Sequence, residues 1–180
     1  MAKNSVSIKA AKGFLAGYLA LQVMEPVTEF LYDHEDPKAK KLEDEVRGGK
    51  AAYAVAAEKL SDLLHLDLSK KATQSLSVVL HVSLGLSVSI LYAFTRRENP
   101  KTLTSGMLQG VGLGAAVFLV ADEGLNWVMG FSPPPQKFPW QAHARGAIAH
   151  LVYGLAAESV FRGLEKLEDE SVNQFFAQAA

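Results

Sequence analysis

Each apolar segment of this chain carries ionisable side chains: Glu25, Glu29, His81, Asp122, Glu123 and His150. Titratable groups inside apolar helices are costly unless they are paired, hydrated or bound to an ion. Histidine and buried carboxylates exchange protons near neutral pH, and the same groups are ligands of zinc, manganese and iron. We therefore expect a buried polar site that handles or senses protons or ions, or that holds a divalent transition metal through Glu25, His81, Asp122 and His150.

Four apolar segments must position these groups, and they extend over residues 11–32, 76–94, 103–131 and 144–161. About 20 helical residues cross a hydrocarbon core of roughly 30 Å. The hydrophobic content of 49% and mean hydropathy of +0.09 would also suit a soluble four-helix bundle, but these segments lack its charged face. We predict an all-α four-transmembrane-helix bundle in residues 1–170, followed by a C-terminal tail at 171–180.

The ionisable groups are predicted to share one depth in the membrane. Consecutive spans run in opposite directions, so Glu25 near the end of one span and His81 after the start of the next lie at a similar level. Asp122 near the end of the third span and His150 after the start of the fourth lie at a similar level for the same reason. At 1.5 Å per residue all four lie roughly 10 to 15 Å below the surface that bears the two longer loops. We expect Asp122, rather than its neighbour Glu123, to face the centre.

Small residues recur every fourth position along the spans, as in close helix packing within membranes. The packing glycines predicted from this pattern are Gly106, Gly110, Gly114, Gly146 and Gly154. The rows continue into the ionisable residues, which predicts that those residues point into the bundle. Glu158 and Arg162 lie one turn apart in the last span and are predicted to form a secondary ion pair.

The long loop between the first two spans is predicted to be helical over residues 36–71, because loops of this length rarely lack structure. Asp36-Pro37 begins one amphipathic helix and Gly48-Gly49 separates it from the next. The second connection is rich in proline and flanked by Trp127 and Trp140, as in an interfacial aromatic belt. The residues expected to form a lid or entrance are Arg47, Tyr53, His143 and Arg145.

Composition excludes several classes of function. The chain has no cysteine, which excludes disulfides and thiolate sites, and its net charge of −1 gives no basis for nucleic-acid binding. It also has no nucleophile–base arrangement, phosphate loop or dinucleotide motif, so an enzyme is disfavoured. Basic residues flank the spans on one side, which favours cytoplasmic termini. These residues are Lys3, Lys9, Lys12, Arg96, Arg97, Lys101, Arg162 and Lys166.

Two parts of the sequence resemble a known family. The run Pro133-Pro-Pro-x-x-Phe138-Pro-Trp140, followed by Ala149-His150-Leu-Val-Tyr153-Gly and then Glu158 and Arg162, resembles the C-terminal half of the YagU-like family of bacterial inner-membrane proteins. Gly13-Phe-Leu-Ala-Gly17 is similar to the opening helix of that family, whereas the charged loop 34–71 departs from its pattern. The resemblance implies a multi-pass protein of the bacterial inner membrane and, because the family has no assigned function, no reaction.

Four roles for the polar residues follow. The polar residues form a proton or ion site, hold a metal or cofactor, or form a hydrogen-bonded network that fixes helix register. As a fourth alternative, the whole protein is an accessory or scaffold subunit whose glycine rows bind another membrane protein or a second copy of this chain. The lipid bilayer is the expected partner in every case.

Overall fold

The computed structural model describes residues 5–100 and 102–178, and this part of the chain contains only helices and their connections. The long helices are α1 (Val6–Asp33), α4 (Lys70–Thr95), α5 (Leu103–Ala116) and α7 (Trp140–Gln178). A π-helical segment, η2 (Val117–Leu125), and a short helix, α6 (Asn126–Val128), extend α5 without interruption. The predicted all-α class is thus confirmed, while Lys3 and Lys101 lie outside the described residues.

Side-chain caps explain where three of the long helices begin. Ser5 accepts a hydrogen bond from the Ile8 amide at the start of α1, and Ser69 caps α4 in the same manner. Thr102 and Ser105 form a reciprocal capping box at the start of α5. Such caps satisfy amide groups that have no partner within the helix.

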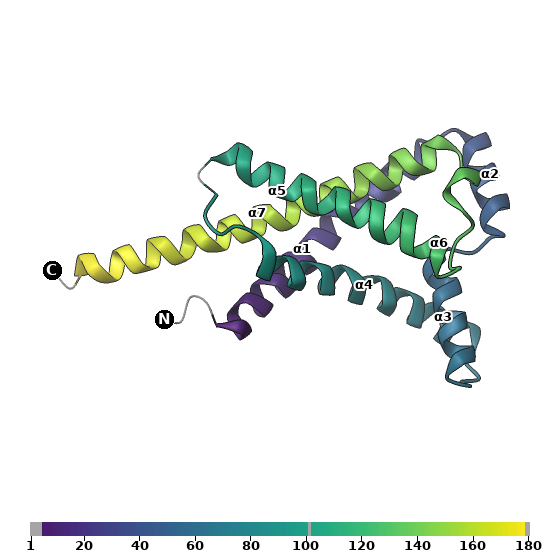
Figure 1. Cartoon of the computed structure of the whole chain (residues 1–180), viewed down its shortest axis with the longest axis horizontal. Helices are drawn as coiled ribbons and strands as arrows, with labels where there is room; N and C mark the ends of the chain where they lie inside the picture. The colour runs from purple at the N-terminus through teal and green to yellow at the C-terminus, as the bar shows by residue number, and fades with distance from the viewer. Residues whose placement is uncertain (1–4, 101, 179–180) are drawn as a thin grey trace.

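The long helices form one bundle, with the start of α1 and the end of α7 at the same end of it. α1 packs against α4 and α7, and α5 packs against α7. Figure 1 shows the start of α1 and the end of α7 at one end of the bundle and α2 and α3 at the other. We refer to these as the terminal end and the lid end. α7 extends well beyond the bundle, and residues 171–178, which the sequence predicts as a C-terminal tail, form the end of this helix.

The first loop folds into α2 (Pro37–Arg47) and α3 (Ala52–Leu63), which together we call the lid. Asp36 caps α2 by accepting a hydrogen bond from the Lys38 amide at 2.7 Å. Gly48 and Gly49 have φ angles of +63° and +73°, a left-handed conformation that favours glycine and ends the helix. The predicted break between the two helices is therefore confirmed.

Glycine allows backbone contact between α5 and α7. A Cβ atom added at Gly110 would lie 2.8 Å from the Gly154 carbonyl oxygen, and one added at Gly114 would lie 2.7 Å from the Leu151 Cα. On the other side of the bundle, a Cβ at Gly13 in α1 would lie 2.6 Å from the Ile90 Cα in α4. These two seams are closer than any other residue type would permit.

Two helical stretches are long and apolar enough to cross a membrane: α4 and the continuous run Leu103–Val128. The more polar α1 and α7 do not meet this criterion. Only 11% and 17% of the apolar windows of the two qualifying stretches are buried within the protein. Large apolar side chains such as Leu91 and Leu108 are each 65% exposed. The core helix of a soluble protein would bury such residues.

Candidate functional site

Two histidines from facing helices line one small cavity inside the bundle. His81 lies on α4 and His150 on α7, and the cavity between them has a volume of about 20 Å³. Tyr53 from the lid and Tyr153 from α7 also line it. A cavity of this volume holds about one water molecule. We call His81 and His150, together with the adjacent Tyr53, Glu25 and Asp122, the histidine layer.

Hydrogen bonding sets the roles of the imidazole nitrogens in His150. Its Nδ1 donates to the Gly146 carbonyl oxygen at 2.8 Å, because a carbonyl only accepts. The Nε2 is therefore the ring atom that can accept a proton. The His81 Nδ1 lies 3.7 Å from the Glu25 Oε1, and His81 is also within electrostatic reach of His150 and Asp122.

Tyr53 lines both this cavity and a larger, open one. Its ring stacks on His81 with a centroid distance of 4.5 Å. On its other side lies an open cavity of about 350 Å³, whose lining includes Lys40, Arg47 and Asp122. Burial, and secondly the charge of Asp122, raises the pKa of Tyr53 to about 12. Tyr53 is thus a neutral donor across the pH range in which histidine titrates.

Glu25 and Glu29 are not buried, which corrects the prediction for both. The Glu25 side chain is 62% exposed, and Glu29 is exposed as well. The reason is geometric, since each step of four residues rotates about 40° around a helix with 3.6 residues per turn. The buried face of α1 therefore passes from Gly17 and Leu21 to Met24 rather than to Glu25. Glu25 remains beside His81 at the rim of the histidine layer.

The candidate metal ligands Glu25, His81, Asp122 and His150 do not form a metal site. In residues 5–100 and 102–178, no group of three or more histidine, aspartate or glutamate side chains has an arrangement that would hold a metal ion. Asp122 instead accepts a hydrogen bond from Asn126 at 3.3 Å and lies against Gly146, where an added Cβ would be 3.1 Å from its Oδ2. In this arrangement the four side chains do not converge on one metal ion, so the structure gives the metal hypothesis no support at these residues.

Glu123 belongs to a separate contact near the lid end. Its Oε1 lies 2.7 Å from the His143 Nδ1, and the other ring nitrogen of His143 lies 3.1 Å from the Pro135 carbonyl oxygen. Both acidic residues lie in η2, whose π-helical turn alters the angle between neighbouring side chains. Short π-helical segments occur often at functional sites. A sequence pattern based on α-helical spacing does not reveal this segment.

Arginines fasten the lid to the bundle. Arg145 from α7 forms ion pairs with Glu35, just after α1, and with Glu43 of α2. Arg47 binds the same Glu43 at 2.9 Å and lies over the ring of Phe138. Glu43 is only 5% exposed, so these contacts are shielded from solvent. The sequence identified the two arginines but missed both carboxylates, which are scattered among other acids in the loop.

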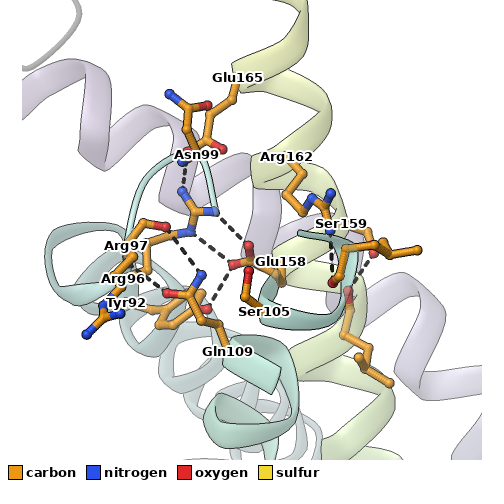
Figure 2. A network of polar contacts seen from close by, with 12 residues as sticks. Tyr92, Arg96, Arg97, Asn99, Ser105, Gln109, Glu158, Ser159, Arg162 and Glu165 are labelled. Atoms are coloured by element: carbon orange, nitrogen blue, oxygen red, sulfur yellow. Dashed lines mark hydrogen bonds and ion pairs between the residues drawn. The ribbon is translucent and has the colours of Figure 1, made fainter. Parts of the chain in front are cut away.

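A second polar cluster lies at the terminal end, and it replaces the predicted pair of Glu158 with Arg162. Arg96 at the end of α4 donates to both carboxylate oxygens of Glu158, at 3.0 and 2.7 Å, and also binds Glu165. Tyr92 donates to Glu158 at 2.8 Å. Figure 2 shows the Arg162 side chain directed away from the Glu158 carboxylate, and its guanidinium donates instead to the Leu103 carbonyl oxygen at the start of α5.

We call Tyr92, Arg96, Glu158 and Glu165 the Arg96 cluster. The Arg96 and Glu158 side chains are 3% and 2% exposed. Burial alone would lower the pKa of Arg96, but its bonds to Glu158 and Glu165 outweigh burial and raise it further. Arg96 thus stays charged, and the two carboxylates leave the cluster with an excess of acceptors. Sequence analysis placed Arg96 only among the flanking basic residues.

Comparisons with models of protein families, with curated proteins and with solved structures gave no match to this chain. The arrangement of the site therefore carries the functional argument.

Proposed function

We propose that this protein is a four-span membrane protein that transfers or senses protons through the histidine layer. The observation that carries the proposal is the pair of imidazoles, His81 and His150, that line one cavity of about 20 Å³ beneath Tyr53. Two imidazoles joined by space for about one water form a unit suited to proton transfer, because histidine is the side chain whose ordinary pKa lies nearest neutral pH. Ionisable groups within a membrane-spanning segment indicate a functional site by default.

The exposed apolar surface supports the membrane part of this proposal. α4 and the run Leu103–Val128 provide two of the four spans, and exposed Phe14, Leu19 and Val23 on α1 add a third apolar face. The central part of α7 is the fourth span. Trp127 and Trp140 are 47% and 72% exposed at the lid end, as in an aromatic belt at a membrane interface.

The positions of basic residues support an orientation with both termini in the cytoplasm. Lys9, Lys12, Arg96, Arg97 and Lys166 belong to the terminal end of α1, α4 and α7. Cytoplasmic flanks carry an excess of such residues. The lid and the histidine layer then face the outside. The resemblance to the YagU-like family is consistent with a bacterial inner-membrane location and is part of this proposal.

Proton exchange at the lid end has two available groups. Glu25 is exposed and adjacent to His81, so it can take up a proton from the surroundings and pass it to the imidazole. Tyr53 lines both the open cavity under the lid and the cavity between the histidines, so in this proposal it is the second group through which protons enter from the lid end.

Proton flux into sealed vesicles tests the proposal. The full chain is reconstituted into vesicles loaded with a pH-sensitive dye, and potassium efflux through valinomycin provides the driving force. Wild-type protein is expected to acidify the vesicles, whereas His81→Ala and His150→Ala should remove this activity. His65→Gln is the matched control, because His65 is exposed and lies outside the bundle.

A wild-type flux equal to that of empty vesicles would overturn proton transfer as the function. A flux that persists in both His81→Ala and His150→Ala would show that protons cross elsewhere. Size-exclusion profiles of each variant in detergent separate a loss of activity from a loss of folding.

A further inference from the structure

We propose that a line of hydroxyl and carboxylate groups between α4 and α7 connects the histidine layer with the Arg96 cluster. Glu158 is then the proton-exchanging group at the terminal end. This inference rests on the proton transfer proposed above and assigns its route through the bundle. It gives Tyr153, Ser89, Tyr92 and Glu158 a role that the histidine layer alone does not require.

The route begins at Tyr153. Its side chain lines the same cavity as His81 and His150 and is 2% exposed. Its hydroxyl donates to the Gly85 carbonyl oxygen on α4 at 2.6 Å. A proton that leaves the histidine cavity therefore meets a hydroxyl already directed at the facing helix.

Ser89 is the next group on α4, one turn after Gly85. It is 0% exposed, adjoins the Tyr153 hydroxyl, and its Oγ has no hydrogen-bond partner in the described part of the chain. A buried hydroxyl without a partner costs about 1–3 kcal/mol and requires an explanation. Because no fixed bond holds it, this hydroxyl can accept a proton from Tyr153 and donate its own in the other direction.

Tyr92 follows Ser89 by three residues, a rise of about 4.5 Å along the helix. Its hydroxyl donates to the Glu158 Oε2 at 2.8 Å. The proposed route requires a rotation of the Ser89 hydroxyl and one intervening water at this step. The ring of Tyr92 packs edge-on against Phe161 at 5.8 Å, which fixes its hydroxyl toward α7.

Glu158 is the acceptor at the end of this line. The groups that face it are Tyr92 and Arg96 from α4, and Glu165 reaches it through Arg96, as Figure 2 shows. A cavity of about 190 Å³ lined by Arg96, Glu165 and Lys12 opens beyond the cluster. Arg96 and Glu165, which belong to the cluster, border this cavity, and the proposed route leaves the protein there.

The transfer is balanced at every step. The Tyr153 hydroxyl must first rotate from the Gly85 carbonyl oxygen toward Ser89; a proton then moves from the His150 Nε2 to the Tyr153 oxygen as the Tyr153 hydroxyl proton moves to Ser89. Ser89 passes its own proton to the intervening water, the water passes one of its protons to Tyr92, and Tyr92 passes its proton to Glu158, so each hydroxyl and the water remain neutral. Glu158 becomes neutral, while Arg96 keeps its charge and its bond to Glu165. Rotation of the hydroxyls restores the starting arrangement.

Conservative variants test the route in the same vesicles. Tyr153→Phe, Ser89→Ala and Glu158→Gln are expected to reduce the proton flux about 100-fold, the lower range of what loss of a positioned proton-transfer group costs. Tyr18→Phe and Ser159→Ala are matched controls, since both residues are exposed, and they should conduct like the wild type. In thermal unfolding, Tyr153→Phe should melt slightly below the wild type because it loses the hydrogen bond to Gly85, and Ser89→Ala at or above it because it removes an unpaired buried hydroxyl.

The outcomes separate this inference from the proposed function. If Tyr153→Phe and Ser89→Ala conduct like the wild type while His81→Ala does not conduct, the proposed route is wrong and the histidine site is retained. If the wild type itself does not conduct, both the route and the proposed proton transfer are wrong. If Glu158→Gln fails to fold, Tyr153→Phe and Ser89→Ala still decide, because neither removes a charge. Loss of stability without loss of flux would assign these hydroxyls to packing only.

Discussion

Replacing Gly114 with alanine should drive α5 and α7 apart. The added Cβ would lie 2.7 Å from the Leu151 Cα and closer still to the His150 carbonyl oxygen. Ordinary van der Waals contact begins at 3.4 Å, so the helices must separate by about 0.7 Å or more. Both obstacles are backbone atoms and cannot rotate away. Overpacking of this kind costs about 1–3 kcal/mol.

Gly112 on the same helix gives the matched control. A Cβ there meets nothing within 4 Å, so Gly112→Ala should stabilise the protein by up to about 1 kcal/mol through helix propensity. The measurement is thermal unfolding of both variants in one detergent. We expect Gly114→Ala to melt several degrees below the wild type and Gly112→Ala at or above it. Equal melting temperatures would refute the close contact of α5 with α7.

Two further predictions concern charge and titration. Tyrosinate absorbance should show Tyr53 titrating near pH 12, and Asp122→Asn should lower that pKa toward 10. Because the folded pKa is the higher, the stability that neutral Tyr53 contributes is complete below pH 10 and is lost as the pH rises to about 12. An unchanged Tyr53 pKa in Asp122→Asn would contradict a contribution from the charge of Asp122. Arg96→Gln should cost about 3–5 kcal/mol by leaving Glu158 buried and unpaired, and Arg162→Gln about 1 kcal/mol or less. Equal unfolding free energies of these two variants would contradict the pairing of Arg96 with Glu158.

The helical class and the lid could be predicted from local signals. Asp36-Pro37 and Gly48-Gly49 act through their own backbone geometry, so the ends of α2 did not depend on distant contacts. The prediction that Glu25 is buried was wrong because residues spaced four apart move progressively around the helix over several turns. Over a single turn, as between Gly110 and Gly114, the drift is small and both residues face α7.

Partners across helices could not be predicted in the same way. Glu158 and Arg162 are one turn apart, so sequence spacing favours their pairing. Arg96 is 62 residues away from Glu158, yet it reaches both oxygens of this carboxylate. Long side chains bridge α4 and α7 here, and the placement of these two helices depends on their packing against α1, which no local sequence pattern encodes.

The middle of the bundle contains few buried hydroxyl groups, so a small number of variants can test the proposed route. Between the histidine layer and the Arg96 cluster the core consists of small and apolar residues, including Ala20, Leu21 and Ala157. Among the buried side chains that the structure describes in this region, Ser89 and Tyr153 supply the hydroxyl groups. Unpaired polar groups are expensive in such surroundings. Removing both hydroxyls together leaves only apolar contacts between the two clusters, so a double variant that still conducts protons would require a route that does not use Ser89 and Tyr153.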